Sequence, residues 1–186
     1  MNLDHLHWPE DGWGYMKPNK DILSTYAWIE KTIRPRRLIE FGFHAGHSTT
    51  YQLETFPESA IVTFGVSRET RQGAENMSKK YGGRFTFYKK STLDIDPYMF
   101  FPGSFDYALV DSNHKYKVVA NEIKLLVKWK VPYILFDNCE QAEVQRAIDN
   151  NLPNAQLIKQ FPYMGDWKGV TKDLMMKLYH VPTYSI

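Results

Sequence analysis

The sequence predicts an α/β protein built on one open sheet, and three observations support this. From residue 36 onward, short apolar segments alternate with longer amphipathic ones, which is the pattern of strands joined by right-handed helical crossovers in a mostly parallel sheet. The last two strand-like segments follow one another with no helix between them, so we expect them to pair as antiparallel neighbours. Seven strand-like segments then give an open sheet with one reversed strand near an edge.

The predicted strands are short segments rich in aliphatic and aromatic residues, bounded by turn-forming or charged residues. They cover residues 36–41, 60–66, 84–88, 105–110, 132–136, 155–163 and 173–181. The sixth is expected to run parallel to the first five, so its carboxyl end opens on the same edge of the sheet.

Helices are predicted where apolar residues recur at helical spacing or where a polar surface helix fits between two strands. They cover residues 21–33, 48–56, 68–81, 115–129 and 141–150. The first begins near Asp21 as a cap and ends before Pro35. Gly82 and Gly83 stop the third. The stripe expected to be buried in the fourth consists of Val118, Ile123, Leu126 and Val127.

Length and charge limit the classes of protein that fit. A chain of 186 residues with 43% hydrophobic residues suits one domain over residues 1–186, with an N-terminal arm and helix in 1–34 and the core in 35–186. A net charge of +2 gives no electrostatic footprint for nucleic acid or an anionic membrane. The one cysteine, Cys139, cannot form an internal disulfide, and we find no signal-peptide pattern or membrane-length apolar run, so we expect a cytoplasmic protein.

The segment IEFGFHAGHS, residues 39–48, places an acid and two glycines between the first strand and its helix. A glycine loop at this point of an α/β sheet usually binds a ligand at the carboxyl ends of the strands. A P-loop needs four residues between its glycines and then a lysine, whereas three residues separate Gly42 from Gly46 and a histidine follows. The nicotinamide fingerprint needs a central glycine, which is missing here. The remaining pattern is acid-x-Gly-x-x-x-Gly, beginning at Glu40.

This pattern, together with FDYALVDSNHKYKVVANEI at 105–123 and YILFDN at 133–138, resembles the class I S-adenosylmethionine-dependent methyltransferases. The nearest among them are small-molecule O-methyltransferases, whose fourth strand often ends in a D-G-D-H-x-Y pattern. The resemblance covers roughly residues 36–181. It implies a Rossmann-like fold of seven strands with the last one antiparallel, S-adenosylmethionine as cofactor, and methyl transfer to a small-molecule hydroxyl.

The resemblance also implies which residues hold the cofactor. Gly42 and Gly46 let the backbone approach its methionine part, and the Glu40 carboxylate helps to hold its amino group. Ser48 either caps the next helix or meets the cofactor carboxylate. The implied cofactor-binding set is Glu40, Gly42, Phe43, His44, Gly46, Ser48, Ser67, Ser91, Thr92 and Asp111. The alternative is a plain strand–loop–helix turn that uses glycines for its geometry alone.

Two places in this set leave more than one interpretation open. The family usually ends its second strand with an acid that grips the ribose hydroxyls, whereas Ser67 stands here, with Glu69 two residues on. Ser67 makes one weaker bond, Glu69 replaces it, or Ser67 is only a helix cap. Ser91 and Thr92 lie where the family loop borders the adenine, but Ser91 with Asp94 also fits a capping box.

Acidic and amide side chains follow the fourth and fifth strands. Asp111 ends one, and Asp137 with Asn138 ends the next, so in a parallel sheet they meet at one edge. Oxygen ligands suit Mg²⁺ or another divalent cation, and the resemblance to catechol-type O-methyltransferases implies that these three hold Mg²⁺. The alternative is that Asp111 and Asn138 cap the helices that follow.

His114 stands where the catechol-type enzymes carry their catalytic lysine, so the implied catalytic residues are His114, as general base, and Asp111. One alternative places His114 against the adenine. Another is a transition-metal site formed by His44, His47 and Asp111. Cys139 begins a helix, where a lowered pKa would make it reactive, but inert packing is more usual and we assign it no role.

Aromatic residues mark the acceptor side. Tyr163, Met164 and Trp167 follow the sixth strand and are candidates for the wall of a pocket for a planar or apolar acceptor. A possible lid in the N-terminal arm consists of His7, Trp8, Trp13, Tyr15 and Met16. The expected partner is a small molecule, with no nucleic acid and no membrane, and a homo-oligomer stays open.

Two competing functions come from other classes of protein. Methylation of nucleic acid is disfavoured by the near-neutral charge and by DSNH at 111–114, where amino-directed DNA enzymes carry Asp/Asn-Pro-Pro-aromatic. A binding domain of the same fold without catalysis is consistent with Ser67 in place of the ribose-binding acid.

Overall fold

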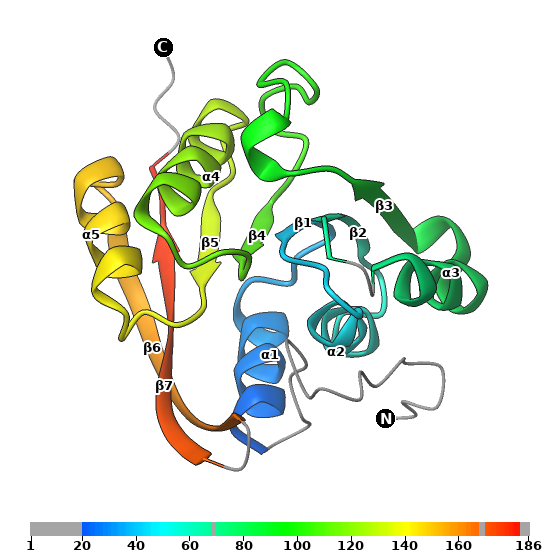
Figure 1. The fold of residues 1–186 in the computed structure, drawn as a ribbon, viewed down its shortest axis with the longest axis horizontal. Helices are drawn as coiled ribbons and strands as arrows, with labels where there is room; N and C mark the ends of the chain where they lie inside the picture. Colours follow the sequence, from blue (N-terminus) through cyan, green and yellow to red (C-terminus); the bar gives the residue numbers. More distant parts are fainter. Residues whose placement is uncertain (1–19, 68–69, 168–169, 183–186) are drawn as a thin grey trace.

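The computed structural model describes residues 20–67, 70–167 and 170–182, and a seven-stranded sheet lies at its centre (Figure 1). The strands are arranged in the order β3-β2-β1-β4-β5-β7-β6. Their bounds are β1 Arg37–Phe41, β2 Ala60–Gly65, β3 Phe85–Lys89, β4 Tyr107–Val110, β5 Tyr133–Phe136, β6 Gln156–Trp167 and β7 Val170–His180. All seven predicted strands are confirmed, and β6 and β7 extend beyond their predicted ends.

The direction of the strands follows the length of the connections between them. β1 pairs in parallel with β2 and β4, β2 with β3, and β4 with β5. β7 is antiparallel to β5 and to β6, so the reversed strand lies one position in from the edge. The predicted antiparallel pair is therefore confirmed. The carboxyl ends of β1, β2, β4 and β5 share one edge of the sheet, and the candidate site residues follow them.

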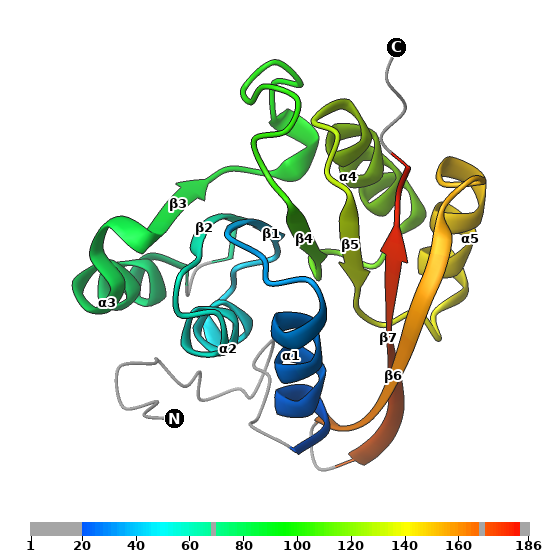
Figure 2. The same cartoon turned by 180° about the vertical axis from the view of Figure 1, so that it is seen from behind.

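Helices cover both faces of the sheet, as Figures 1 and 2 show from opposite sides. α1, α2 and α3 share a core with one face, and α4 and α5 share a core with the other. Their bounds are α1 Lys20–Thr32, α2 His47–Thr55, α3 Thr70–Tyr81, α4 Tyr116–Lys128 and α5 Ala142–Asn151, with short 3-10 turns η1 Gly82–Arg84 and η2 Thr92–Asp94. Within the described ranges, none of the helices has the length and apolar character needed to cross a membrane.

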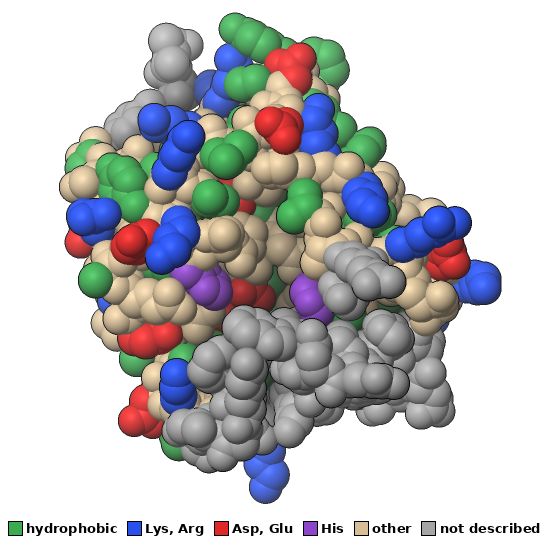
Figure 3. All heavy atoms as spheres, viewed as in Figure 1, with side chains coloured by type: hydrophobic (Ala, Val, Ile, Leu, Met, Phe, Trp, Pro, Cys, Tyr) green, Lys and Arg blue, Asp and Glu red, His purple; other side chains and the backbone are tan. Residues whose placement is uncertain are grey.

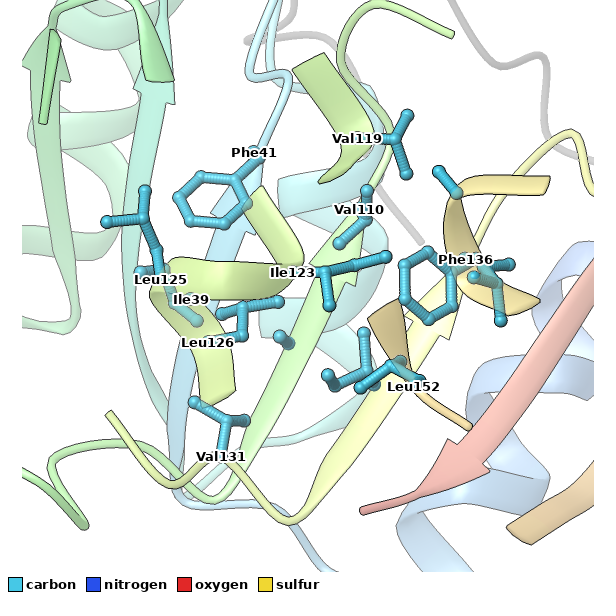
Figure 4. Close-up of a cluster of buried hydrophobic side chains, with 14 of the residues drawn as sticks. Ile39, Phe41, Val110, Val119, Ile123, Leu125, Leu126, Val131, Phe136 and Leu152 are labelled. Atoms are coloured by element: carbon cyan, nitrogen blue, oxygen red, sulfur yellow. The ribbon is translucent and has the colours of Figure 1, made fainter. Parts of the chain in front are cut away.

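Alternate side chains of β4 show how the sheet divides the core, because successive residues of a strand point to opposite faces. Tyr107 and Leu109 belong to the cluster with α1, α2 and α3. Ala108 and Val110 belong to the cluster with α4 and α5. Figure 4 shows Val110 in this second cluster, with Ile123 of α4 and side chains of the neighbouring strands.

The buried face of α4 differs from the predicted stripe. Ile123 and Leu126 are buried as predicted, but Val118 is only half-buried and Val127 is 44% exposed. With 3.6 residues per turn, positions 119, 123 and 126 face the sheet and position 127 is rotated away. Glu122 lies on the buried side of the helix and is fully enclosed. A carboxyl group therefore lies on the buried face of α4, among side chains that are mostly apolar.

Candidate active site at the carboxyl edge of the sheet

The glycine loop joins β1 to α2 and packs closely against the end of β4. Gly42 and Gly46 have φ values of 114° and 89°, which other residues adopt only with strain. A Cβ atom on Gly42 would lie 1.8 Å from the carbonyl oxygen of Asp111 and 2.9 Å from the Cα of Ser112. The absence of a side chain at Gly42 is therefore required by the protein itself, since the loop touches the backbone after β4.

Glu40 is buried at the end of β1 and is held by the first turns of α2. Ser48 Oγ and Thr49 Oγ1 donate hydrogen bonds to its two carboxyl oxygens, and Gln52 Nε2 lies 3.4 Å from one of them. Burial raises the pKa of Glu40 to about 7, although the two hydroxyl hydrogen bonds oppose the shift. The predicted capping role of Ser48 is wrong, because the N-cap of α2 is Gly46 and the Ser48 hydroxyl is bonded to Glu40.

Phe43 contributes its side chain to the core. The ring is buried and lies 5.4 Å and 5.0 Å, centroid to centroid, from the rings of Phe85 and Phe87. A Cβ atom on Gly46 would lie 3.0 Å from the same ring. The side chain of Phe43 therefore fills the space between the glycine loop and β3, and its backbone is the part left for the predicted contact with a cofactor. His44, beside it, has a φ of 45° and is half-buried.

Ser67 follows β2, and its backbone and its hydroxyl have different surroundings. Its carbonyl oxygen accepts a 2.7 Å hydrogen bond from Thr70 Oγ1 in the first turn of α3, so the backbone rather than the side chain makes the cap. The hydroxyl oxygen is buried without a hydrogen-bond partner among the described residues. A buried polar atom in that state is costly, and a ligand hydroxyl would satisfy it. The predicted alternative, Glu69, lies outside the described residues.

Ser91 and Thr92 lie after β3 and are both engaged within the protein. Ser91 is the N-cap of η2, and its hydroxyl accepts a 3.3 Å hydrogen bond from the backbone N–H of Leu93. Its capping role is therefore confirmed. Thr92 Oγ1 donates a 2.7 Å hydrogen bond to Oε1 of Glu122 in α4. Thr92 is almost fully buried, so its side chain holds the loop against α4.

Asp111 and His114 form a pair after β4. His114 Nε2 lies 3.6 Å from Asp111 Oδ1 and is itself buried, while the two side chains as wholes are 28% and 22% exposed. The other ring nitrogen, Nδ1, lies 3.3 Å from Gln141 Nε2. Burial lowers the pKa of His114. The hydrogen bond and charge of Asp111, together with the charges of Asp137 and Glu140, raise this pKa by more, so the net shift is upward.

Asp137 and Asn138, after β5, are each held by a neighbouring side chain. Tyr163 of β6 donates a 2.7 Å hydrogen bond to Asp137 Oδ1, and Asn138 Nδ2 donates a 3.3 Å hydrogen bond to Glu140 Oε1. Burial and the charge of Asp111 raise the pKa of Asp137 well above its ordinary value, against the opposing effect of the Tyr163 bond. The side chains predicted to bind Mg²⁺ thus follow β4 and β5 at one edge of the sheet, and Asp137 and Asn138 are each hydrogen-bonded to another side chain of the protein.

No group of three or more His, Cys, Asp and Glu side chains within 20–67, 70–167 and 170–182 is arranged to hold a metal ion. The alternative transition-metal site of His44, His47 and Asp111 is therefore wrong. The capping alternatives for Asp111 and Asn138 are also wrong, because the N-caps of α4 and α5 are Lys115 and Gln141 and neither helix has a side-chain cap.

Cys139 and the residues predicted for the acceptor side also lie near this edge of the sheet. Cys139 is buried, and burial raises its pKa to about 12, so its lack of a reactive role is supported. Tyr163 is buried against Asp137, whereas Met164 is 50% exposed. The N-terminal arm and the side chain of Trp167 lie outside the described part of the chain. Figure 3 shows histidine and acidic side chains gathered near the centre of the face seen in Figure 1.

Two interactions at the site were not predicted from the sequence. Glu122 lies between the loops after β3 and β4, and Tyr163 is the partner of Asp137. A sign of the first was present in the sequence, since Glu122 shares its helical face with Val119, Ile123 and Leu126. The second joins residues 26 positions apart on different strands, and no local pattern marks it.

A sheet in this order, with one reversed strand, a glycine loop after β1 and acids after β4 and β5, defines the Rossmann-like class I methyltransferase fold. Residues 39–139 match the methyltransferase domain family, and the chain belongs to that family. The resemblance seen in the sequence, to class I S-adenosylmethionine-dependent methyltransferases, is therefore confirmed. Among curated proteins, none matches this sequence.

Solved structures share the fold at low sequence identity. The O-methyltransferase TomG from Streptomyces achromogenes, involved in tomaymycin synthesis and solved with S-adenosylmethionine, has a TM-score of 0.67 and 18% identity over 88% of this chain and 81% of its own. An O-methyltransferase from Bacillus cereus, solved with S-adenosylhomocysteine, has a TM-score of 0.66 and 14% identity over 93% and 84%. A candidate RNA methyltransferase from Pyrococcus horikoshii has a TM-score of 0.66 and 10% identity over 90% of each chain.

Proposed function

We propose that this methyltransferase transfers the methyl group of S-adenosylmethionine to a hydroxyl of a small-molecule acceptor. The observation that carries the proposal is the partly exposed pair of His114 and Asp111, which lies directly beside the glycine loop where Gly42 meets Asp111. TomG and the Bacillus cereus protein, which share the fold, are O-methyltransferases, and their structures contain the cofactor or its product. A general base beside a cofactor loop is the arrangement that methylation of a hydroxyl requires.

The cofactor supplies an electrophilic methyl group, and the residues at the edge of the sheet fit it. The backbone of the loop from Gly42 to Gly46 would hold its methionine part, with Glu40 behind the loop fixing the start of α2. The hydroxyl of Ser67, which has no hydrogen-bond partner within the described ranges, would meet the ribose. The loop that carries Ser91 and Thr92 would border the adenine, with its own side chains turned to the protein.

The chain's own catalytic work is to align the acceptor and to remove one proton. The neutral imidazole of His114 accepts the proton of the acceptor hydroxyl, and the Asp111 carboxylate beside Nε2 stabilises the imidazolium that results. Gln141 on Nδ1 fixes the orientation of the ring. Tyr163 holds Asp137 in place beside this pair. Alignment of the acceptor oxygen with the methyl group supplies most of the remaining rate enhancement.

Whether Mg²⁺ or another divalent cation assists the reaction is a question for experiment, and the roles given above to His114 and Asp111 do not depend on it. Two carboxylates, Asp111 and Asp137, lie at the same edge and interact electrostatically, which favours a cation. Their present partners, and that of Asn138, are side chains of the protein. The proton transfer above is therefore derived from His114 and Asp111 alone.

A small-molecule acceptor is favoured over nucleic acid by charge. The whole chain carries a net charge of +2, whereas nucleic-acid enzymes usually present a strongly basic face. The candidate RNA methyltransferase that shares the fold keeps RNA as the second acceptor to test.

We also propose a cytoplasmic location, since the one cysteine is buried and unpaired.

The experiment is a screen for S-adenosylhomocysteine formation from S-adenosylmethionine with catechols, other hydroxylated aromatics and unmodified transfer RNA. We expect turnover with a member of the hydroxylated set and none with RNA, because a chain with a net charge of +2 lacks the strongly basic character usual in nucleic-acid enzymes. Each reaction is run with Mg²⁺ and with chelator. Turnover that survives the chelator assigns catalysis to His114 and Asp111, and turnover that requires Mg²⁺ adds the cation. Turnover with RNA alone would overturn the choice of acceptor.

A further inference from the structure

Glu122 is a fully buried carboxyl group on the face of α4 that packs against the sheet. It accepts hydrogen bonds on one oxygen, Oε1, from Thr92 Oγ1 at 2.7 Å and from Ser112 Oγ. Its other oxygen, Oε2, is buried without a hydrogen-bond partner among the described residues. A leucine would suit the apolar surroundings better, so the carboxyl group needs an explanation beyond packing.

The two donors come from different loops at the carboxyl edge of the sheet. Thr92 belongs to η2, after β3, and Ser112 follows β4 directly after Asp111. The helix makes a second contact with the first loop, because Asn121 Nδ2 donates a 2.8 Å hydrogen bond to the carbonyl oxygen of Thr92. Glu122 and Asn121 of α4 thus both hold the loop after β3, and Glu122 also holds the loop after β4.

The fixed part of the second loop also supports the glycine loop. A Cβ atom on Gly42 would come within 2.9 Å of the Cα of Ser112, so these two backbones are in contact. Displacement of Ser112 would therefore disturb the loop after β1 as well as Asp111 and His114. Glu122 therefore supports the loops after β3 and β4 directly and the loop after β1 through Ser112, and these three loops surround the place proposed for the cofactor.

We propose that Glu122 is a positioning residue that holds the loops after β3 and β4 in the arrangement that binds the cofactor. It acts through Thr92 and Ser112 and touches neither the cofactor nor the acceptor. This inference rests on the proposed function, since it assigns the role relative to the proposed cofactor site. Its chemistry needs an acceptor oxygen at Oε1 and does not need a negative charge.

The test compares Glu122→Gln, which keeps an acceptor oxygen at the same place, with Glu122→Ala, which removes it. The measured quantities are the Kd for S-adenosylhomocysteine by calorimetric titration and the free energy of unfolding in urea. We expect Glu122→Ala to raise the Kd about tenfold and Glu122→Gln to stay within about threefold, as loss of two buried hydrogen bonds predicts. The titration is done at a temperature where both variants are folded, so lost stability alone does not change the Kd.

The double variant Thr92→Val, Ser112→Ala removes the same hydrogen bonds from the other side and serves if Glu122→Ala does not fold. It should weaken binding by a similar factor, and adding Glu122→Gln to it should have little further effect. An unchanged Kd in a folded Glu122→Ala or in the double variant overturns the inference, as does equal weakening by Glu122→Gln. Failure of the wild-type protein to bind S-adenosylhomocysteine is a different result, which rejects the proposed function itself.

Discussion

Replacing His114 with alanine is expected to lower turnover by about 10²–10⁴-fold, the usual contribution of a general base. The affinity for S-adenosylhomocysteine should stay nearly unchanged, because His114 is paired with Asp111 and Gln141 and is proposed to face the acceptor. Steady-state kinetics with the acceptor found in the screen measures the first quantity, and calorimetric titration measures the second.

The matched control is His180→Ala, which removes a half-buried histidine at the end of β7 that contacts the ring of Tyr133. It should leave turnover of the folded protein unchanged. A parallel loss of cofactor affinity and turnover in His114→Ala would move His114 to the adenine side of the site. Full activity in that variant would remove it from catalysis.

The pH profile supplies an independent readout of the same base. The pKa of His114 is raised above its ordinary value, with Asp111 as the main raising influence. Only the neutral imidazole accepts a proton, so turnover should be low below this raised pKa and should increase as the pH rises through it. Asp111→Asn removes the charge that raises the pKa and should move the rise to lower pH. A profile that is flat across this range would exclude His114 as the base.

Replacing Gly42 with alanine is expected to cost about 3 kcal/mol or more of unfolding free energy, since overpacking and a strained backbone add. The added Cβ would lie 1.8 Å from the backbone oxygen of Asp111, and the residue would keep a φ of 114°. Because the obstacle is backbone, no side-chain rotation relieves it. Urea unfolding followed by circular dichroism measures the loss.

Gly103→Ala separates the two causes. Gly103 also has a positive φ, of 80°, but a Cβ atom there would meet nothing within 4 Å. Its substitution should cost only the backbone strain, about 1–2 kcal/mol. Equal losses at Gly42 and Gly103 would show that the contact between the glycine loop and Asp111 is looser than the structure has it.

The strands and their directions could be predicted because they depend on local properties. Short β-rich segments and the length of each connection specify a mostly parallel sheet with β7 reversed. The ends of the strands also follow from this, so the approach of Asp111 and Asp137 at one edge was foreseeable. The prediction for the buried face of α4 is wrong at Val127, because hydrophobicity alone places this residue in the stripe although it lies off the face that contains Ile123.

The partners of Glu122 and Asp137 could not be predicted, since they are distant in sequence. Glu40 bonds to Ser48 and Thr49 within the same loop and helix, but Glu122 bonds to Thr92, 30 positions away. The requirement for glycine at position 42 has the same origin. Sequence reasoning attributes it to space for a ligand, whereas the structure shows contact with the backbone after β4.

Calorimetric titration of the wild-type protein with S-adenosylhomocysteine tests the central claim most directly. The account predicts saturable binding of one ligand per chain, with a rise in melting temperature that grows with ligand concentration because the ligand binds only the folded state. Neither NAD nor ATP should bind, since the loop around Gly42 lacks the spacing of either fingerprint. A folded protein that shows no heat and no shift in melting temperature at millimolar S-adenosylhomocysteine would contradict the account.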